Sequence, residues 1–235
     1  MSAVSRLTRC VLIAALAVHV TWQAFAPRPS AQASALPVPP PTAWLRAASF
    51  GEPVAFSQLL TLYLQAFDNQ PGVSIPLAQL DYAVVVAWLS ALLELDPVGQ
   101  YPLMMASHVY AQVADEAKQR TMLEFVHRQV MRDPERRWRW LAHAALVAKH
   151  RLHDLPLALR YAEDVARNAR SAPGWARQMR IFILEDMGES EAAAVLLGGL
   201  LDSGEVTDTN EIRFLTQRLA SIKSAEKSSR SPPLR

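Results

Sequence analysis

The chain of 235 residues contains one cysteine, Cys10, and only eight glycines. A single cysteine excludes a disulfide within the chain and a metal site built from thiolates. The sequence also lacks a phosphate-binding loop, a dinucleotide-binding fingerprint and a Gly-x-Ser-x-Gly nucleophile elbow. We therefore predict no catalytic residues, no metal site and no cofactor.

The small net charge of +2 hides an uneven distribution of charge along the chain. Four arginines and one acidic residue precede Pro53, and four basic residues and one acidic residue follow Ser221. Of 24 basic and 22 acidic residues, 16 basic and 20 acidic residues thus lie between these points. A mildly acidic body disfavours nucleic-acid binding, which depends on neutralising phosphates.

The N-terminus has the pattern of an export signal. Residues 1–9 include Arg6 and Arg9, and the apolar run 10–26 follows them. At 1.5 Å per residue this run spans roughly 25 Å, somewhat less than the ~30 Å hydrocarbon core of a bilayer. We expect a signal anchor in the inner membrane with the body in the periplasm. Cleavage after Ala33, within a small-x-small step, remains an alternative and would release a periplasmic or secreted protein.

The rest of the chain divides by composition into three parts. Residues 27–52 are rich in proline and predict an extended, semi-rigid spacer. Residues 53–221 have apolar residues at helical spacing and predict the folded domain. Residues 222–235 are rich in serine, lysine and proline and predict a disordered basic tail.

Within the folded part, the spacing of apolar residues predicts an all-α domain. The first helix begins at Pro53, where a missing N–H is tolerated. The other expected helices cover about 77–95, 101–113, 117–131, 138–150, 157–166, 175–186, 189–201 and 208–221. The last of these is expected to cap the open end of a stack.

An internal periodicity relates these helices to one another. Pro97, Pro134 and Pro173 each follow an apolar helical run, at spacings of 37 and 39 residues. The first helices repeat one spacing of residues, seen in Phe56, Leu59, Leu60, Tyr63; Leu103, Ala106, Ser107, Tyr110; and Trp140, His143, Ala144, Val147. The third position is small in Ser107 and Ala144 but not in Leu60. Among second helices, Ala158 and Ala193 fit the small position. The chain resembles a degenerate tetratricopeptide-repeat (TPR) array. This resemblance implies a right-handed superhelix of about four antiparallel helix pairs.

In the TPR family, the first helices line a concave groove that binds partner proteins. Matching positions in this chain are Ser57, Thr61, Tyr101, Met104, His108, Gln112, Trp138 and Arg180. This mixed polar and aromatic lining suits an extended peptide or a helix of a partner. The resemblance therefore implies a groove that binds protein.

Two patterns suggest chemistry but are incomplete. His143, His150 and His153 could present three imidazoles to zinc, yet the last two fall at a helix end. Gly188-Glu189-Ser190 resembles the Glu-Ser step of lytic transglycosylases, but the glycine-rich motif around it is missing. We therefore expect a membrane-tethered periplasmic scaffold, accessory to an envelope assembly such as a secretion, pilus or transporter complex. A helical peptidoglycan enzyme is the alternative.

Overall fold

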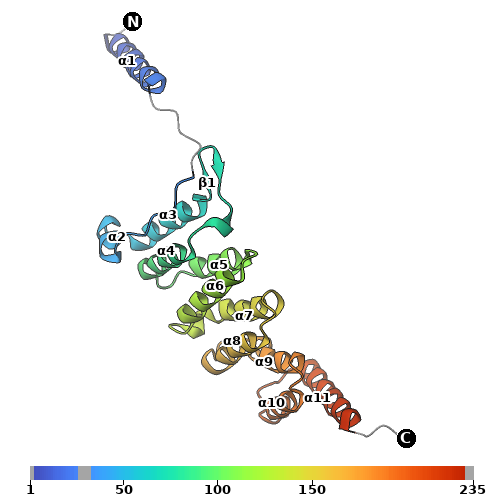
Figure 1. The fold of residues 1–235 in the computed structure, drawn as a ribbon. Helices are drawn as coiled ribbons and strands as arrows, with labels where there is room; N and C mark the ends of the chain where they lie inside the picture. The colour runs from blue at the N-terminus through green and yellow to red at the C-terminus, as the bar shows by residue number, and fades with distance from the viewer. Residues whose placement is uncertain (1–2, 26–32, 231–235) are drawn as a thin grey trace.

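The computed structural model describes residues 3–25 and 33–230, which are almost entirely helical (Figure 1). The first helix, α1 (Ala3–Phe25), is long and apolar enough in Thr8–Phe25 to cross a membrane, a property that signal sequences share. Its side chains from Thr8 onward are exposed. The Ala31-Gln32-Ala33 cleavage step lies mostly outside the described residues.

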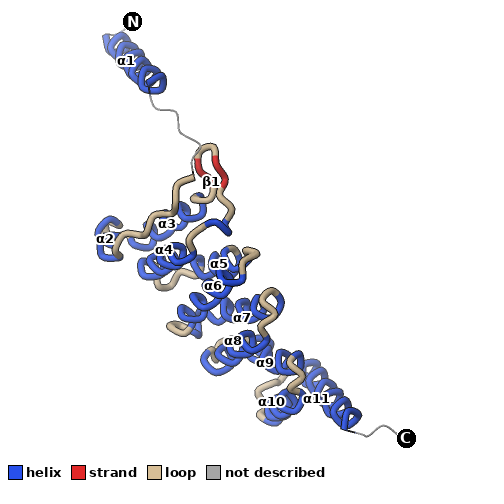
Figure 2. Tube along the Cα trace, viewed as in Figure 1, coloured by secondary structure: helices blue, strands red, loops and turns tan. Residues whose placement is uncertain are grey.

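The body is a row of consecutive helices with short turns (Figure 2). The helices are α2 (Thr42–Ala48), α3 (Pro53–Ala66), α4 (Tyr82–Leu95), α5 (Tyr101–His108), α6 (Glu116–Val130), α7 (Pro134–His150), α8 (Leu155–Asn168), α9 (Gly174–Asp186), α10 (Ser190–Asp202) and α11 (Thr209–Arg230). Short 3₁₀ turns, η1 (Leu77–Gln79) and η2 (Tyr110–Gln112), and a two-stranded hairpin of β1 (Asn69–Gln70) and β2 (Val73–Ser74) complete the described elements.

Aspartates mark where several of these helices begin. Asp81, Asp115 and Asp154 each accept a hydrogen bond from a backbone amide in the first turn of α4, α6 and α8. Such a cap satisfies a donor that has no partner within the helix. Proline occupies a first-turn position of α3, α5, α7 and α8, where its missing N–H has no cost.

The helices pack in consecutive pairs, α3 with α4, α5 with α6, α7 with α8 and α9 with α10, and α11 packs on α10. Each pair also contacts the next through α4–α5, α6–α7 and α8–α9. The all-α prediction is therefore confirmed. We call α3, α5, α7 and α9 the first helices and α4, α6, α8 and α10 the second helices.

Small residues at the predicted positions allow these helices to approach closely. Ser107, Ala144, Ala158 and Ala193 are all fully buried. The hydroxyl of Ser107 donates to the carbonyl of Leu103 in its own helix, so its burial leaves the donor satisfied. The burial expected of these four small residues is therefore observed.

The first helix pair departs from the predicted register. Leu59 and Tyr63 were expected inside, but they are 60% and 41% exposed. The face of α3 that is buried against α4 carries Ser57, Thr61 and Leu64 instead. The Ser57 hydroxyl donates to the Leu92 carbonyl at 3.0 Å, which ties the two helices together.

The proline-rich segment is partly docked on the body rather than forming a free spacer throughout. Ser34 and Gln70 exchange two hydrogen bonds of 2.8 and 2.9 Å between backbone and side-chain amide. Leu36 is buried, and the indole N–H of Trp88 donates to the Pro37 carbonyl at 2.7 Å. The short helix α2 follows this docked segment, at residues that were predicted to be part of the spacer.

At the other end, the helix α11 continues to Arg230, where a disordered tail from residue 222 was predicted. Ile222 is 7% exposed and belongs to a small core with Leu215 and Leu197, which explains why the helix persists there. Residues 231–235 lie outside the described part of the chain.

Buried residues form three separate clusters. The main core runs from Leu36 to Ile183 and includes the buried apolar residues of the second and third helix pairs. A second core joins α9, α10 and α11 around Ile181, Leu197 and Leu215. A small third core holds Leu45 of α2 against the C-terminal half of α4.

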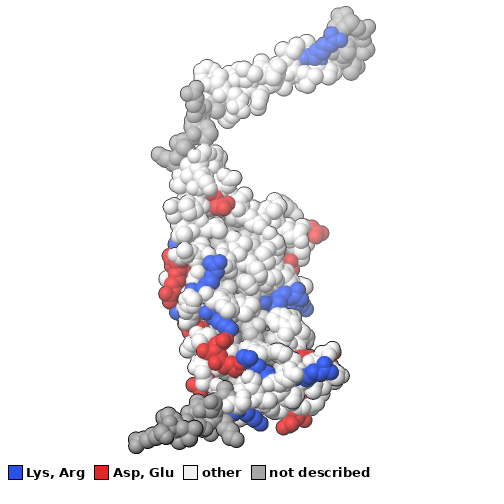
Figure 3. All heavy atoms as spheres, turned by 90° about the vertical axis from the view of Figure 1, so that its right-hand side faces the viewer, with Lys and Arg blue, Asp and Glu red and all other residues white. Residues whose placement is uncertain are grey.

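Charge is unevenly distributed over the body. Helices α3 and α5 contain no Asp, Glu, Lys or Arg, and α4 contains only Glu94. Figure 3 shows this as a largely uncharged upper body above a lower part dense in both signs. Helices α3, α4 and α5 therefore present a less charged surface than the rest of the body.

Candidate functional site

Contacts between successive first helices define one continuous face of the body. The side-chain amide of Gln65 on α3 donates to the Tyr101 hydroxyl on α5 at 2.5 Å. Between α5 and α7, the indole N–H of Trp140 donates to the Gln100 side chain at 2.6 Å. Lys149 on α7 forms an ion pair with Asp186 on α9. These contacts lie between first helices alone, so the face is distinct from that of the second helices.

A cavity of about 410 Å³ opens on this face between α3 and α5. Its lining consists of Gln58, Thr61, Leu62, Gln65 and Tyr101, without a charged residue. Leu62 and Tyr101 are 62% and 45% exposed, whereas Thr61 contributes only its edge. The cavity thus combines amide groups with apolar and aromatic surface.

The middle of the face contains a histidine pair. His108 on α5 stacks on His143 on α7 with ring centroids 3.6 Å apart, and Trp140 contacts the edge of His108. His143 Nε2 is buried without a hydrogen-bond partner among the described residues. Burial lowers the pKa of His143, and the neighbouring His108 lowers it further. His143 is therefore held in its neutral form at neutral pH.

Two tryptophans continue the face toward the C-terminus. Trp138 on α7 meets Trp175 on α9 edge to face, with ring centroids 5.8 Å apart. The guanidinium of Arg139 lies 5.9 Å from the Trp138 ring. Trp175 is 57% exposed. We call Tyr101, His108, Trp138, Trp140 and Trp175 the first-helix row.

Most of the residues predicted to line a groove belong to this face or its border. Tyr101 and His108 are exposed, and Met104, Gln112 and Trp138 are half-buried. The structure does not support the same position for Ser57, which is 4% exposed and bonded to α4, or full access for Thr61, at 6%. Ser57 is a packing residue because the α3 register differs from the predicted one.

Arg180 lies beside a different cavity from the other predicted groove residues. It borders a cavity of about 130 Å³ with Ala166 of α8 and Leu196 and Leu200 of α10, among the second helices. Gly174 and Gln178 of its own helix α9 line the same cavity. The fourth pair departs from the repeat pattern, and the placement of Arg180 on a partner-binding groove stays a prediction.

The sequence reading missed Leu62, Gln65 and Trp175 as parts of this face. Trp175 lies near the start of α9, just as Trp138 lies near the start of α7. This similarity could have predicted that Trp175 belongs to the same face. Leu62 and Gln65 could not be placed because the register of α3 was wrong. The corrected face is more aromatic than the predicted one.

The two patterns that suggested chemistry are not assembled. His150 and His153 are exposed, whereas His143 stacks on His108. Among the described residues, no group of three His, Cys, Asp or Glu side chains is placed to hold a metal ion. Glu189 is exposed at the turn before α10. No protein-family model, curated protein or solved structure matches the chain.

Proposed function

We propose that the protein is a membrane-tethered, TPR-like scaffold that binds a partner protein along its first-helix row. The main observation in support of this proposal is the face formed by the first helices, with its exposed aromatic rings and the cavity of about 410 Å³ beside Tyr101. Aromatic residues are enriched at protein interfaces because they bury large areas at low entropic cost. Consecutive packing of the helix pairs supports a TPR-like superhelix.

The chemistry of the cavity favours an uncharged segment of the partner. Gln58 and Gln65 offer amide donors and acceptors that match a peptide backbone. Leu62 and Tyr101 offer apolar contact to a side chain of that peptide. Burying a charged side chain there would leave it without a partner charge, which is costly. The occupant is therefore an extended or helical segment with apolar anchors.

The tether in this proposal is α1, retained in the inner membrane with Arg6 and Arg9 on the cytoplasmic side. The body then lies in the periplasm, as an accessory to an envelope assembly. A reporter active only outside the cytoplasm, fused after Arg235, is expected to be active. If this reporter is silent and a reporter that works only in the cytoplasm is active at the same point, the proposed orientation is wrong.

A photo-crosslinking experiment in cells tests the binding face. A photoreactive residue at Leu62 or Trp175 is expected to form adducts with the same partner. Thr121, exposed on the second helix α6, is the matched control and is expected to give none. In addition, Tyr101→Ala is expected to lower the yield at Leu62 because it removes one wall of the cavity. Equal adducts from Thr121, or none from the face, would contradict the proposed binding face.

A further inference from the structure

A cavity of about 450 Å³ lies at the edge where successive helix pairs are joined. It is bordered by α2, the turn after α4, the end of α6 and the start of α7. Four arginines line it, Arg46, Arg132, Arg136 and Arg137, together with Glu94 and Asp133. In Figure 2 the turns between pairs lie on the left-hand edge of the body. The cavity is therefore separate from the face of the first helices.

Arg137 forms the floor of this cavity and is only 4% exposed. Its two terminal nitrogens donate to the carbonyls of Gln129 and Pro97, at 2.8 and 2.6 Å. Its Nε is buried without a hydrogen-bond partner among the described residues. A buried donor without a partner is unfavourable and marks a place where an acceptor could be bound.

The two carboxylates do not neutralise the four guanidinium groups. Asp133 pairs with Arg136 at 3.4 Å. The Glu94 carboxylate accepts from the Thr42 hydroxyl, whereas its backbone carbonyl accepts from Arg46. Arg132 has no ion pair within the described part of the chain. The cavity therefore keeps an excess of positive charge beside a buried arginine.

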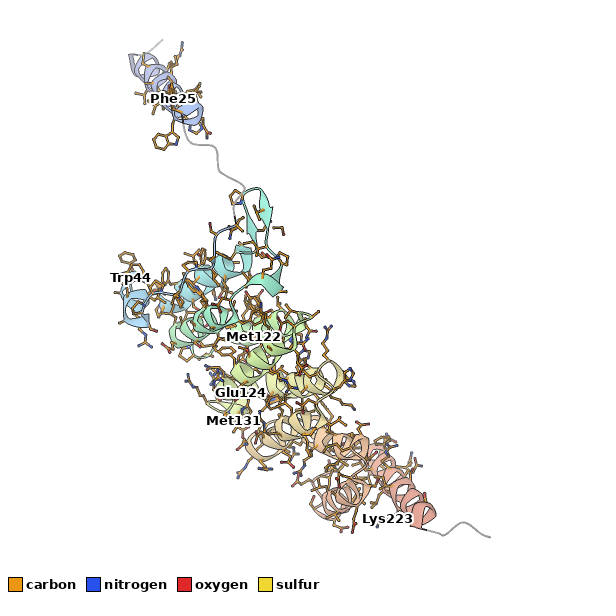
Figure 4. All side chains as sticks on the ribbon, viewed as in Figure 1. Phe25, Trp44, Met122, Glu124, Met131 and Lys223 are labelled. Carbon is orange, nitrogen blue, oxygen red and sulfur yellow. The ribbon has the colours of Figure 1, made fainter. Side chains whose placement is uncertain are left out.

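Exposed apolar side chains flank the same cavity. Val98, in its lining, is 61% exposed, and Met131, next to Arg132, is 38% exposed. Trp44, two residues before Arg46, is 60% exposed. Figure 4 shows Trp44 and Met131 on the same left-hand side of the body. Basic residues next to exposed tryptophan and aliphatic side chains are typical of surfaces that meet a bilayer.

We propose that this arginine edge, formed by Arg46, Arg132, Arg136 and Arg137 with Trp44, Val98 and Met131, docks on an anionic phospholipid surface. A headgroup phosphate enters the cavity and accepts hydrogen bonds from the guanidinium groups. Trp44 and the two aliphatic side chains lie at the level of the headgroups. The proposal goes beyond partner binding because it fixes how the body lies at the membrane, and it draws on the α1 tether of the proposed function.

The length of the tether permits this contact. From Phe25 to the docked Ser34 the chain can extend at most about 30 Å, at 3.3 to 3.6 Å per residue. From Ser34 to the start of α2 the docked segment has eight further residues, or about 25 Å if extended. The bilayer is thus within reach of α2, and a short tether raises the effective concentration of the membrane at this edge.

The test uses the full chain in vesicles, with Cys10→Ser and an environment-sensitive dye on Val98→Cys. In vesicles containing anionic phospholipid, we expect a blue-shifted dye that lipids with a headgroup-level quencher can quench. Arg132→Gln with Arg136→Gln should lower the docked-to-undocked ratio roughly thirtyfold, from the usual contribution of an arginine near an anionic surface. Arg213→Gln with Lys223→Gln removes the same charge from exposed positions on α11 and should change the ratio little.

Flotation of the vesicles separates this proposal from the tether. If the chain floats with neutral and anionic vesicles but the dye shift is the same for both double variants, the docking edge is wrong and the tether stands. If it floats only with anionic vesicles and loses this with Arg132→Gln and Arg136→Gln, docking stands and the tether is wrong. If it floats with neither, both are wrong. If inorganic phosphate alone changes the dye signal as much as anionic vesicles do, and the signal does not depend on lipid, the cavity is a site for free anions and lipid docking is wrong.

Discussion

The substitution Ala144→Leu tests the packing of α7 on α8. Ala144 on α7 is fully buried in the same core as Ala158 and Ala162 of α8, which are also fully buried. A leucine adds three heavy atoms at a position that is 0% exposed in the core between the two helices. Adding such volume to a packed core costs about 1 to 3 kcal/mol through strained rotamers and shifted backbones.

For a protein of this size, 1 kcal/mol lowers the melting midpoint by about 2 to 4 °C. We therefore expect Ala144→Leu to melt roughly 2 to 12 °C below the wild type, as measured by circular dichroism on the full-length protein. Ala192→Leu makes the same chemical change at an exposed position of α10 and should stay within about 0.5 kcal/mol. A wild-type midpoint for Ala144→Leu would refute the close packing of α7 on α8.

Two further predictions concern titrating residues. Burial and the nearby His108 lower the folded-state pKa of His143 below 6.5. The neutral His143 therefore contributes its full stabilisation above about pH 6.5, and this contribution is lost as the pH falls through the lowered pKa. Melting curves at several pH values should show this loss of stability in the wild type and less of it in His143→Gln. Asp154→Ala should cost about 1 kcal/mol in denaturant unfolding by removing the cap of α8, whereas Asp154→Asn keeps an acceptor. Since the Arg120 hydrogen bond and then the Leu157 amide lower the pKa of Asp154 below 3.8, the advantage of wild type over Asp154→Asn should be present above about pH 4 and disappear as the pH falls further.

The sequence predicted best where a local pattern alone determines the structure. The helix pairs around Ser107 and Ala144 follow from apolar spacing, small residues and proline. The docking of Pro37 on Trp88 could not be predicted, since the two residues are 51 positions apart and their hydrogen bond has no local signature.

The register of α3 was missed for a different physical reason. An amphipathic helix reveals its inner face by the charges on its outer face, and α3 has no charged residue. Leucines lie on several of its sides, so the pattern allows more than one register. Contact with α4 decides among them and buries Ser57. The fourth pair lacks the repeat signature from which Tyr101, His108 and Trp138 were predicted, so the sequence predicts the position of Arg180 less well.

The separation of the buried residues into clusters has a consequence for how the protein opens. The core formed by α9, α10 and α11 is small, and the packing of α9 on α8 joins it to the main core. Regions of this kind unfold locally at a lower free energy than the whole domain. Amides of α10 and α11 should exchange with solvent through such openings while those of α7 and α8 stay protected. A partner that contacts Trp138 and Trp175 together would bridge the two units, and its binding energy would slow the exchange of the C-terminal helices as well.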